Sequence, residues 1–266
     1  MTLTPARPVV ATDTASSTAN TPSPAAFRAG LILSHMGDRR VPLTISDIAI
    51  HLDLAKSSVF NLLVSLEASH MVRRGEHGWV LSYRMLELSR SMLASSTMVA
   101  EFGHIPRALT TLHSETTLLA VLDGTDVIYL ARNGGTQPVR FLAAVGSRAP
   151  AGVTGLGKAM LASLSDLDLD TRLASIGELP RPTVRSHRSV DALHADLMQI
   201  RERGYAVDDE QGVVGVTCVA VAFVAEGMPA AVSATLLAPR ATSDMRSRLA
   251  SELSILARGL SDQEQL

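Results

Sequence analysis

The sequence predicts an α+β protein: an N-terminal winged helix-turn-helix, a linker helix, and a second domain with a largely antiparallel sheet. Three observations predict this fold. Between residues 24 and 84, apolar residues recur at helical spacing and are followed by a hairpin pattern. Beyond residue 115, short apolar segments with strand character alternate with turn residues and single helices. A length of 266 residues is enough for two small domains.

Composition divides the chain further. Residues 1–23 are rich in Thr, Ala, Ser and Pro and show no periodicity, so we expect a disordered tail. The expected domains are the winged helix-turn-helix at 24–84, the linker helix at 85–104 and the second domain at 105–266. Residues 24–96 carry a formal charge of +2 and residues 97–266 carry −4. A basic N-terminal part in an otherwise acidic chain permits nucleic-acid binding by that part.

Other composition values exclude several classes of protein. Aromatic residues are only 3% of the chain, so the core is expected to be aliphatic. The single cysteine excludes an intramolecular disulfide framework and a Cys-rich zinc module. No charged start with an apolar signal segment and no apolar run of about 18 residues is present, so we expect a cytoplasmic protein without a membrane partner.

The helix-turn-helix elements follow one another closely. A first helix is expected to end near Met36, and a second begins after Thr44, a typical N-cap residue. The chain turns at Asp53, and a third helix runs from about Lys56 to Ser69 with an apolar stripe at i, i+3, i+4 and i+7. Two short β segments around the turn 75–78 complete the winged helix-turn-helix order.

The second half alternates differently. Helices are expected at 85–100, 101–115, 155–161, 193–203 and 244–260, and strands at 117–122, 127–131, 139–142, 216–224 and 230–237.

The third helix is the candidate DNA-reading element, because the second helix of a helix-turn-helix enters the major groove. Asn61 can pair with adenine and Phe60 can contact a thymine methyl, while the lysine and serines at the helix start suit phosphate groups. An ordinary solvated surface helix remains the alternative. The candidate DNA-binding residues are Thr44, Lys56, Ser57, Ser58, Phe60, Asn61, Arg73, Arg74 and His77.

Three segments of the second domain hold candidate ligand-binding residues, each with an alternative. Cys218 in an apolar strand is either a small buried hydrophobe or a nucleophile. The run 208–210, Asp-Asp-Glu, is either a solvated turn or part of a metal site. Gly155 to Lys158 lacks the spacing of a phosphate loop, but its backbone N–H groups could seat a carboxylate. The histidines form no paired ligand motif, so no metal and no cofactor are expected.

Five motifs occur together in one order, and on them the chain resembles the IclR (isocitrate lyase regulator) family of transcriptional regulators over residues 26–262. The motifs are KSSV with LL at 56–63, VRR at 72–74, TGLGKA at 154–159, RGYAVDDE at 203–210 and GVTCVA at 215–220. The resemblance implies a GAF-like effector-binding domain after the linker helix, binding to operator DNA as a homodimer or tetramer, and a small-molecule effector, often a carboxylate.

The resemblance also implies which residues bind the effector: Phe141, Ala149, Gly155, Leu156, Asp208, Cys218, Ser233 and Thr235. The sequence departs from the family pattern at four positions. Asn61 stands where Arg is frequent, which favours an adenine contact. Asp53 stands where Gly is usual, and it tolerates left-handed geometry. Gly152 replaces a frequent His and Ala149 a frequent Leu, which suggests a roomier site and a larger effector.

We therefore expect an effector-responsive transcription regulator, a repressor in the first instance, and not an enzyme. Two alternatives come from other classes of protein. One is a sensor or scaffold that binds small molecules but not DNA, suggested by the small charge of the front domain. The other is an enzyme that depends on Cys218, for which no activating histidine is apparent in the sequence.

Overall fold

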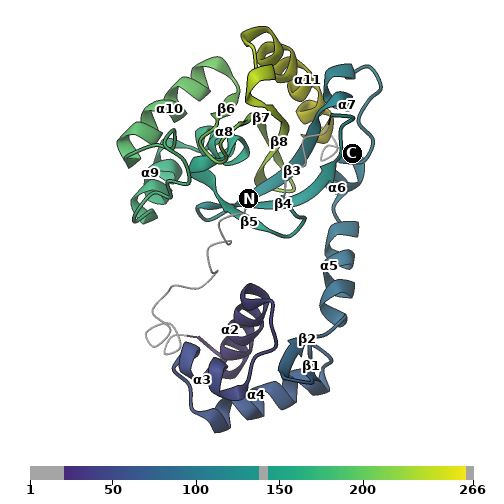
Figure 1. The fold of residues 1–266 in the computed structure, drawn as a ribbon, viewed down its shortest axis with the longest axis vertical. Helices are drawn as coiled ribbons and strands as arrows, with labels where there is room; N and C mark the ends of the chain where they lie inside the picture. Colours follow the sequence, from purple (N-terminus) through teal and green to yellow (C-terminus); the bar gives the residue numbers. More distant parts are fainter. Residues whose placement is uncertain (1–20, 138–142, 262–266) are drawn as a thin grey trace. The chain divides into compact units, whose positions relative to one another are not determined.

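The computed structural model describes residues 21–137 and 143–261. They form two compact units, one ending at Leu93 and the other beginning at Ala94 (Figure 1). The predicted strand 139–142 and the candidate residue Phe141 lie outside the described residues.

The first unit is the predicted winged helix-turn-helix. Its elements are α2 (Pro24–Arg39), α3 (Ile45–Leu52), α4 (Lys56–Ala68), β1 (Val72–Gly75), β2 (Gly78–Leu81) and α5 (Arg84–Ala94). Thr44 caps α3 in a capping box with Asp47, as the sequence indicated. Asp53 takes the predicted left-handed conformation (φ 50°) where the chain turns into α4.

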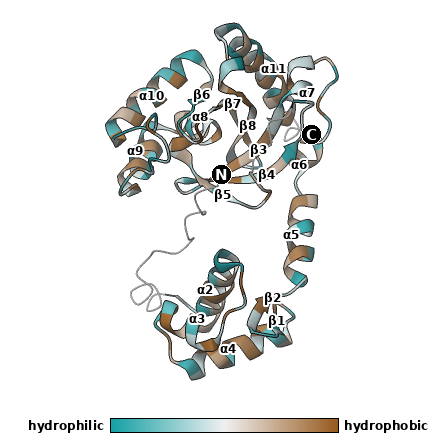
Figure 2. Ribbon diagram, in the orientation of Figure 1, coloured by the Kyte–Doolittle hydropathy of each residue, from teal (hydrophilic) through white to brown (hydrophobic). Residues whose placement is uncertain are grey.

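The core of this unit is made by the apolar faces of α2, α3 and α4 and by the hairpin. Ile32, Ile48, Val59 and Leu63 are completely buried in it. Hydrophobic residues are visible along α4 in Figure 2. Strands β1 and β2 pair antiparallel, and β2 is tied back to the loop before α3 by a bridge between Leu43 and Trp79.

The second unit is built on a six-stranded sheet of order β5-β4-β3-β8-β7-β6, antiparallel throughout. Its strands are β3 (Thr116–Asp123), β4 (Asp126–Asn133), β5 (Arg148–Pro150), β6 (Ala206–Asp209), β7 (Val216–Ala225) and β8 (Met228–Leu237). Its helices are α6 (Thr97–Phe102), α7 (Thr110–Ser114), α8 (Gly155–Ser163), α9 (Asp166–Ser175), α10 (Val190–Arg203) and α11 (Ser243–Ser261), with short 3₁₀ turns at Ala151–Val153 and Ala238–Arg240.

Each face of the sheet carries its own apolar core. Helices α6, α7 and α11 cover one face, where Leu119, Val219 and Leu236 are buried. Helix α8, backed by α10, covers the other face, where Leu118, Ala220 and Ala231 are buried. Neighbouring residues of a strand therefore belong to different cores, because side chains alternate between the faces.

Two helix predictions were wrong. The expected linker helix is interrupted at Ser95 and Ser96, because the Ser96 hydroxyl accepts the Val99 N–H and starts the separate helix α6. The expected helix 101–115 is divided into α6 and α7, and Pro106 lies in the break between them, where its ring cannot continue a helix. Strand β5 and helix α9 were not predicted. Ser165 with Asp168 is the capping signal that could have revealed α9.

No single helix in residues 21–137 and 143–261 is long and apolar enough to cross a membrane. Helices α3 and α4 pass the length and composition test only as a pair, and that pair is bent by 115° at its break.

Candidate functional sites

Helix α4 presents a polar face beside its buried one. Val59, Leu63 and Leu66 face the core. The predicted contacts Lys56, Ser57, Phe60 and Asn61 are exposed, and Ser58 is half-buried. Phe60 keeps 44% of its surface exposed, which is high for an aromatic side chain of an ordered helix. The turn of 115° between α3 and α4 lies in the range of helix-turn-helix motifs.

Thr44 is exposed but already occupied by local bonds. Its hydroxyl donates to Asp47 Oδ2 at 2.7 Å and accepts the Asp47 N–H at 3.2 Å. The structure therefore gives Thr44 a role at the start of α3, and a contact with DNA would have to share that hydroxyl.

The wing carries the other predicted contacts, and all three are exposed. The Arg74 guanidinium lies 5.0 Å from the Trp79 ring centroid and 3.4 Å from Glu67, so it is partly held against its own unit. Arg73 lies 5.8 Å from the Tyr83 ring centroid. Gly78 allows the wing to turn at φ 144°, where a Cβ would lie 2.6 Å from the Leu43 oxygen.

In the second unit, four of the predicted effector residues meet on the α8 side of the sheet. Asp208, Cys218 and Thr235 are register partners on β6, β7 and β8, so their side chains form one row. Ser233 lies two residues from Thr235 on the same face. Gly155, at the start of α8, touches this row, since a Cβ there would lie 3.3 Å from Cys218 Cβ. We call Asp208, Cys218, Ser233, Thr235 and Gly155 the polar row.

Burial affects two groups of the polar row: it shifts the pKa of Asp208 and leaves the Ser233 hydroxyl without a hydrogen-bond partner among the described residues. Burial raises the pKa of Asp208 to about 6, against the opposing effects of the Gly212 and Gln211 N–H groups and of Lys158. Both N–H groups donate to one oxygen, Oδ1, at 3.1 and 2.7 Å. The Ser233 hydroxyl is buried and has no partner among the described residues, which is a costly state for a polar group. A polar ligand would remove that cost.

Two further predicted effector residues lie outside the polar row. Leu156 is buried in the apolar core beside α8, and Ala149 is half-buried on β5. Gly152 does not open a rim, because a Cβ there would lie 3.0 Å from Leu193 Cδ2. Tyr129 was missed by the sequence analysis, although it is 5% exposed and close enough to Cys218 and Asp208 for both to affect its pKa, which burial raises.

The Asp-Asp-Glu run is neither the predicted turn nor a metal site. Asp208 and Asp209 belong to strand β6 and face opposite sides of the sheet. Asp209 pairs with Arg185 and Arg246, and Glu210 with Arg185. Within the described part of the chain, no three His, Cys, Asp or Glu residues are grouped to hold a metal ion.

Cys218 fits the interpretation as a buried residue better than that as a nucleophile. It is 7% exposed, burial raises the pKa of its thiol, and Sγ lies 3.3 Å from Thr235 Oγ1. A reactive cysteine needs a lowered pKa and a neighbouring base.

Behind the polar row lies a buried lysine that sequence reasoning did not assign. Lys158 is fully buried, and its Nζ donates to Asp196 Oδ2 (2.6 Å), to the Val207 carbonyl (2.7 Å) and to Gln211 Oε1. Burial lowers the pKa of Lys158, although Asp196 opposes this. For Asp196 itself burial acts upward, but hydrogen bonds from His187 and Lys158 lower its pKa to about 2.

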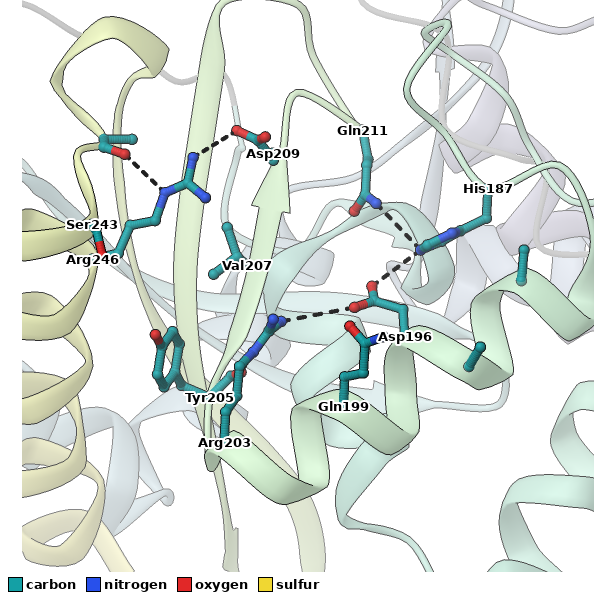
Figure 3. Close-up of a pocket in the computed structure, with 13 residues that line it drawn as sticks. His187, Asp196, Gln199, Arg203, Tyr205, Val207, Asp209, Gln211, Ser243 and Arg246 are labelled. Carbon is teal, nitrogen blue, oxygen red and sulfur yellow. Dashed lines mark hydrogen bonds and ion pairs between the residues drawn. The ribbon is translucent and has the colours of Figure 1, made fainter.

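The structure also has a cavity away from the polar row. It has a volume of about 660 Å³ and lies beyond β6, between α10 and the start of α11 (Figure 3). None of the seven predicted effector residues that the structure describes lines it. Its walls are His187, Ala192, Ala195, Asp196, Gln199, Arg203, Tyr205, Val207, Asp209, Gln211, Ala241, Ser243 and Arg246.

Comparison with known proteins agrees with this architecture. The model of the IclR helix-turn-helix domain matches residues 25–76, and that of the bacterial transcriptional regulator IclR C-terminal domain matches residues 91–262. The HTH-type transcriptional repressor AllR of Escherichia coli (strain K12) is 31% identical over 182 residues, 68% of this chain and 67% of AllR.

Solved structures share the fold. The Thermotoga maritima IclR structure covers 90% of this chain and 97% of its own, with 24% identity and a TM-score of 0.65. A Microbacterium hydrocarbonoxydans IclR homologue, solved with 4-hydroxybenzoate, covers 89% of this chain and 98% of its own, with 24% identity and a TM-score of 0.71.

The winged helix-turn-helix and the second unit with its polar row together define a DNA-binding regulator that responds to small molecules. The chain belongs to the IclR family of bacterial transcriptional regulators, as its motifs indicated.

The buried carboxyl of Asp208 gives a testable pH dependence. Its pKa is about 6 in the folded protein and near 4 when unfolded, so the native state binds the proton more tightly. Protonated Asp208 contributes its full share to the free energy of unfolding below about pH 4. This contribution is lost as the pH rises to about 6. Asp208→Asn keeps an oxygen for both N–H groups, so it should abolish this loss, which is at most about 3 kcal/mol.

Urea unfolding of both proteins across that pH range measures the effect. The difference between wild type and Asp208→Asn should grow in favour of the variant as pH rises and then stay constant. A difference that does not change with pH would show that Asp208 titrates normally.

Proposed function

We propose that this protein is a cytoplasmic repressor that binds a pseudo-palindromic operator as a homodimer or a dimer of dimers, and that an organic carboxylate held at the polar row controls the binding. The observation that carries the proposal is the pairing of an exposed reading face on α4 with a buried, incompletely bonded polar row in the second unit. The repressor direction is carried over from AllR, which is named as a repressor.

The polar row suits a carboxylate. Among the described residues, no acceptor bonds the N–H groups of Gly155 and Leu156 in the first turn of α8. A helix N-terminus favours negative charge. The Ser233 hydroxyl supplies a further donor, and Asp208 can donate as well when it is protonated. Phe141, Ala149, Cys218 and Thr235 complete the proposed set.

The dimer is supported by the surface of α5. No residue of this helix is buried, and large apolar side chains stand exposed on it and just before it: Tyr83 (77%), Leu86 (61%), Leu88 (40%) and Met92 (59%). Exposed apolar patches of this kind mark contact surfaces, and two-fold pairing of recognition helices matches a pseudo-palindrome.

A mobility shift with the full chain on its own upstream DNA tests the proposal. With nonspecific competitor present, we expect a discrete complex that weakens steeply with salt, because phosphate contacts release counterions. Sedimentation of the free protein should show a dimer or tetramer.

4-Hydroxybenzoate, the compound in the Microbacterium structure, is the first carboxylate to add. Release of DNA by it or by a panel of smaller acids, lost in Ser233→Ala, would support the polar row as the effector site. No complex on upstream DNA or on a genomic fragment pool would instead favour a sensor that does not bind DNA.

A further inference from the structure

The cavity beyond β6 has no role in the regulator described so far. Val207 and Asp209 of strand β6 face the cavity (Figure 3). Asp208 lies between them on the strand and faces the polar row on the opposite side, so β6 separates the two. The cavity volume of about 660 Å³ is within the range of small-molecule sites. Nine of its thirteen lining residues come from α10, β6 and α11, and the other four come from the adjoining segments of the same unit.

Two arginines bring their guanidinium groups into this cavity from opposite sides (Figure 3). Arg203 Nε donates to the Tyr205 carbonyl at 2.6 Å, and the group stacks 5.4 Å from the Tyr205 ring centroid. Arg246 Nε donates to the Ala241 carbonyl at 2.8 Å, and its Nη2 donates to Asp209 Oδ1 at 2.9 Å. Both groups are therefore oriented by protein contacts before any ligand arrives.

Each guanidinium still has donors to offer. Among the described residues, no acceptor hydrogen-bonds Arg246 Nη1 or either terminal nitrogen of Arg203. The nearest charge to Arg203 is Asp196 Oδ1 at 3.8 Å, an ion-pair distance beyond hydrogen bonding. Planar guanidinium groups with free N–H pairs match carboxylate and phosphate oxygens.

The acidic residues of the cavity already have cationic partners. Asp196 Oδ2 accepts from Lys158 at 2.6 Å and lies 3.1 Å from His187 Nε2. Asp209 accepts from Arg246 and also from Arg185, at 2.9 Å each. The groups left for a ligand are therefore mainly donors, which favours an anion over a cation.

We propose that this cavity is a second ligand site, distinct from the polar row, that binds a small organic acid through its oxyanion at Arg203 and Arg246. Gln211 joins the two sites. Its backbone N–H donates to Asp208 Oδ1, while its side-chain oxygen accepts from Lys158 at the cavity wall. A ligand beyond β6 thus acts on the same residues that position Asp208. The proposal does not depend on the DNA-binding function.

Thermal unfolding of the full chain tests the site, with succinate and inorganic phosphate as probes at constant ionic strength and near-neutral pH. A ligand that binds only the folded state stabilises it by RT ln(1 + [L]/Kd), so the melting temperature rises with ligand concentration and the rise gives the apparent Kd. Arg203→Gln and Arg246→Gln should each raise the apparent Kd about tenfold or more, because each removes a charged donor.

Two more variants make the result specific. Ala195→Leu places a larger side chain at an exposed position of the cavity wall and removes no hydrogen-bonding group, so it should also weaken the probes. Arg248→Gln is the matched control, because Arg248 is on the same helix as Arg246 but pairs with Asp244 away from the cavity. It should leave the apparent Kd unchanged.

The outcomes separate clearly. If succinate alone stabilises the protein, carboxylates are the ligand class of this site. If phosphate alone does so, phosphate esters are. Either outcome supports the site if the cavity variants reduce the stabilisation and Arg248→Gln does not. The proposal is overturned if neither probe stabilises the wild type at up to about 50 mM. It is equally overturned if Ala195→Leu and Arg203→Gln bind as the wild type does, since the probe would then sit elsewhere.

Discussion

Lys158→Met is expected to lower the free energy of unfolding of the second unit by about 3–5 kcal/mol. The ammonium group of Lys158 is completely buried and bonds three acceptors, from α10, β6 and the segment after β6. Methionine fills a similar volume but leaves the Val207 carbonyl and the Gln211 oxygen without this donor, and leaves the Asp196 charge short of one partner. Removing one member of a buried ion pair is far more costly than losing a surface one.

The two units provide an internal control for this measurement. Trp79 is the only tryptophan and belongs to the winged helix-turn-helix, so its fluorescence reports that unit alone. Circular dichroism follows both units. Lys158→Met should move the dichroism transition to lower urea and leave the fluorescence transition in place. Lys56→Met, at an exposed lysine, should change neither by more than about 0.5 kcal/mol.

A double mutant distinguishes a buried ion pair from simple packing. If Asp196 and Lys158 stabilise each other, the double mutant Lys158→Met/Asp196→Asn should lose less free energy of unfolding than the sum of the two single losses. Strictly additive losses would mean that Lys158 contributes nothing through Asp196 and acts through its other hydrogen bonds and its alkyl chain.

The Lys158 network also illustrates what sequence could and could not predict. The start of α8 was predicted, since a Gly-rich segment precedes an apolar helix. The partners of Lys158 lie 38, 49 and 53 residues further along the chain, and they are brought near it by the packing of α10 on α8 and the pairing of β6 with β7. Local periodicity contains no information about that contact, so neither the network nor the cavity beyond β6 was expected.

The helix-turn-helix was more predictable because its contacts are local. The Thr44 cap, the turn at Asp53 and the stripe from Val59 to Leu66 are encoded within a few residues of each other. The prediction of one continuous linker helix was wrong for a local reason too, since two consecutive serines favour a helix start over a helix interior. The members of the polar row came from the family resemblance, and strand register accounts for why distant residues such as Asp208 and Thr235 share one face.

Asn61→Ala is expected to weaken binding to the preferred operator by about 1–3 kcal/mol, a loss of roughly 5- to 150-fold in Kd. The Asn61 side chain is exposed, and no hydrogen bond within the described residues occupies its amide. It is therefore free to form the bidentate pair with adenine N6 and N7 that an asparagine on a recognition helix can make. Competition binding by fluorescence anisotropy measures the loss.

Specific and nonspecific DNA should respond differently to this change. A base contact contributes little to nonspecific binding, so Asn61→Ala should leave nonspecific affinity and the salt dependence unchanged. Lys56→Ala should instead weaken binding to all sequences alike and reduce the salt slope by about one unit, because it removes a phosphate contact. Equal losses on both kinds of DNA in Asn61→Ala would contradict a base-reading role for Asn61.

Asn61→Arg tests the same base contact by a change of base preference. An arginine at this position carries two parallel donors suited to guanine O6 and N7, whereas asparagine combines one donor with one acceptor to match adenine. The variant should therefore lose affinity for the wild-type operator and regain it when guanine replaces the adenine that Asn61 contacts. A binding-site selection with both proteins should show this exchange at one position of each half-site, because the proposed dimer places the helix in the major groove twice. If the wild type and Asn61→Arg select identical sites, other residues of α4 contact the bases instead, and Phe60 is the next to test.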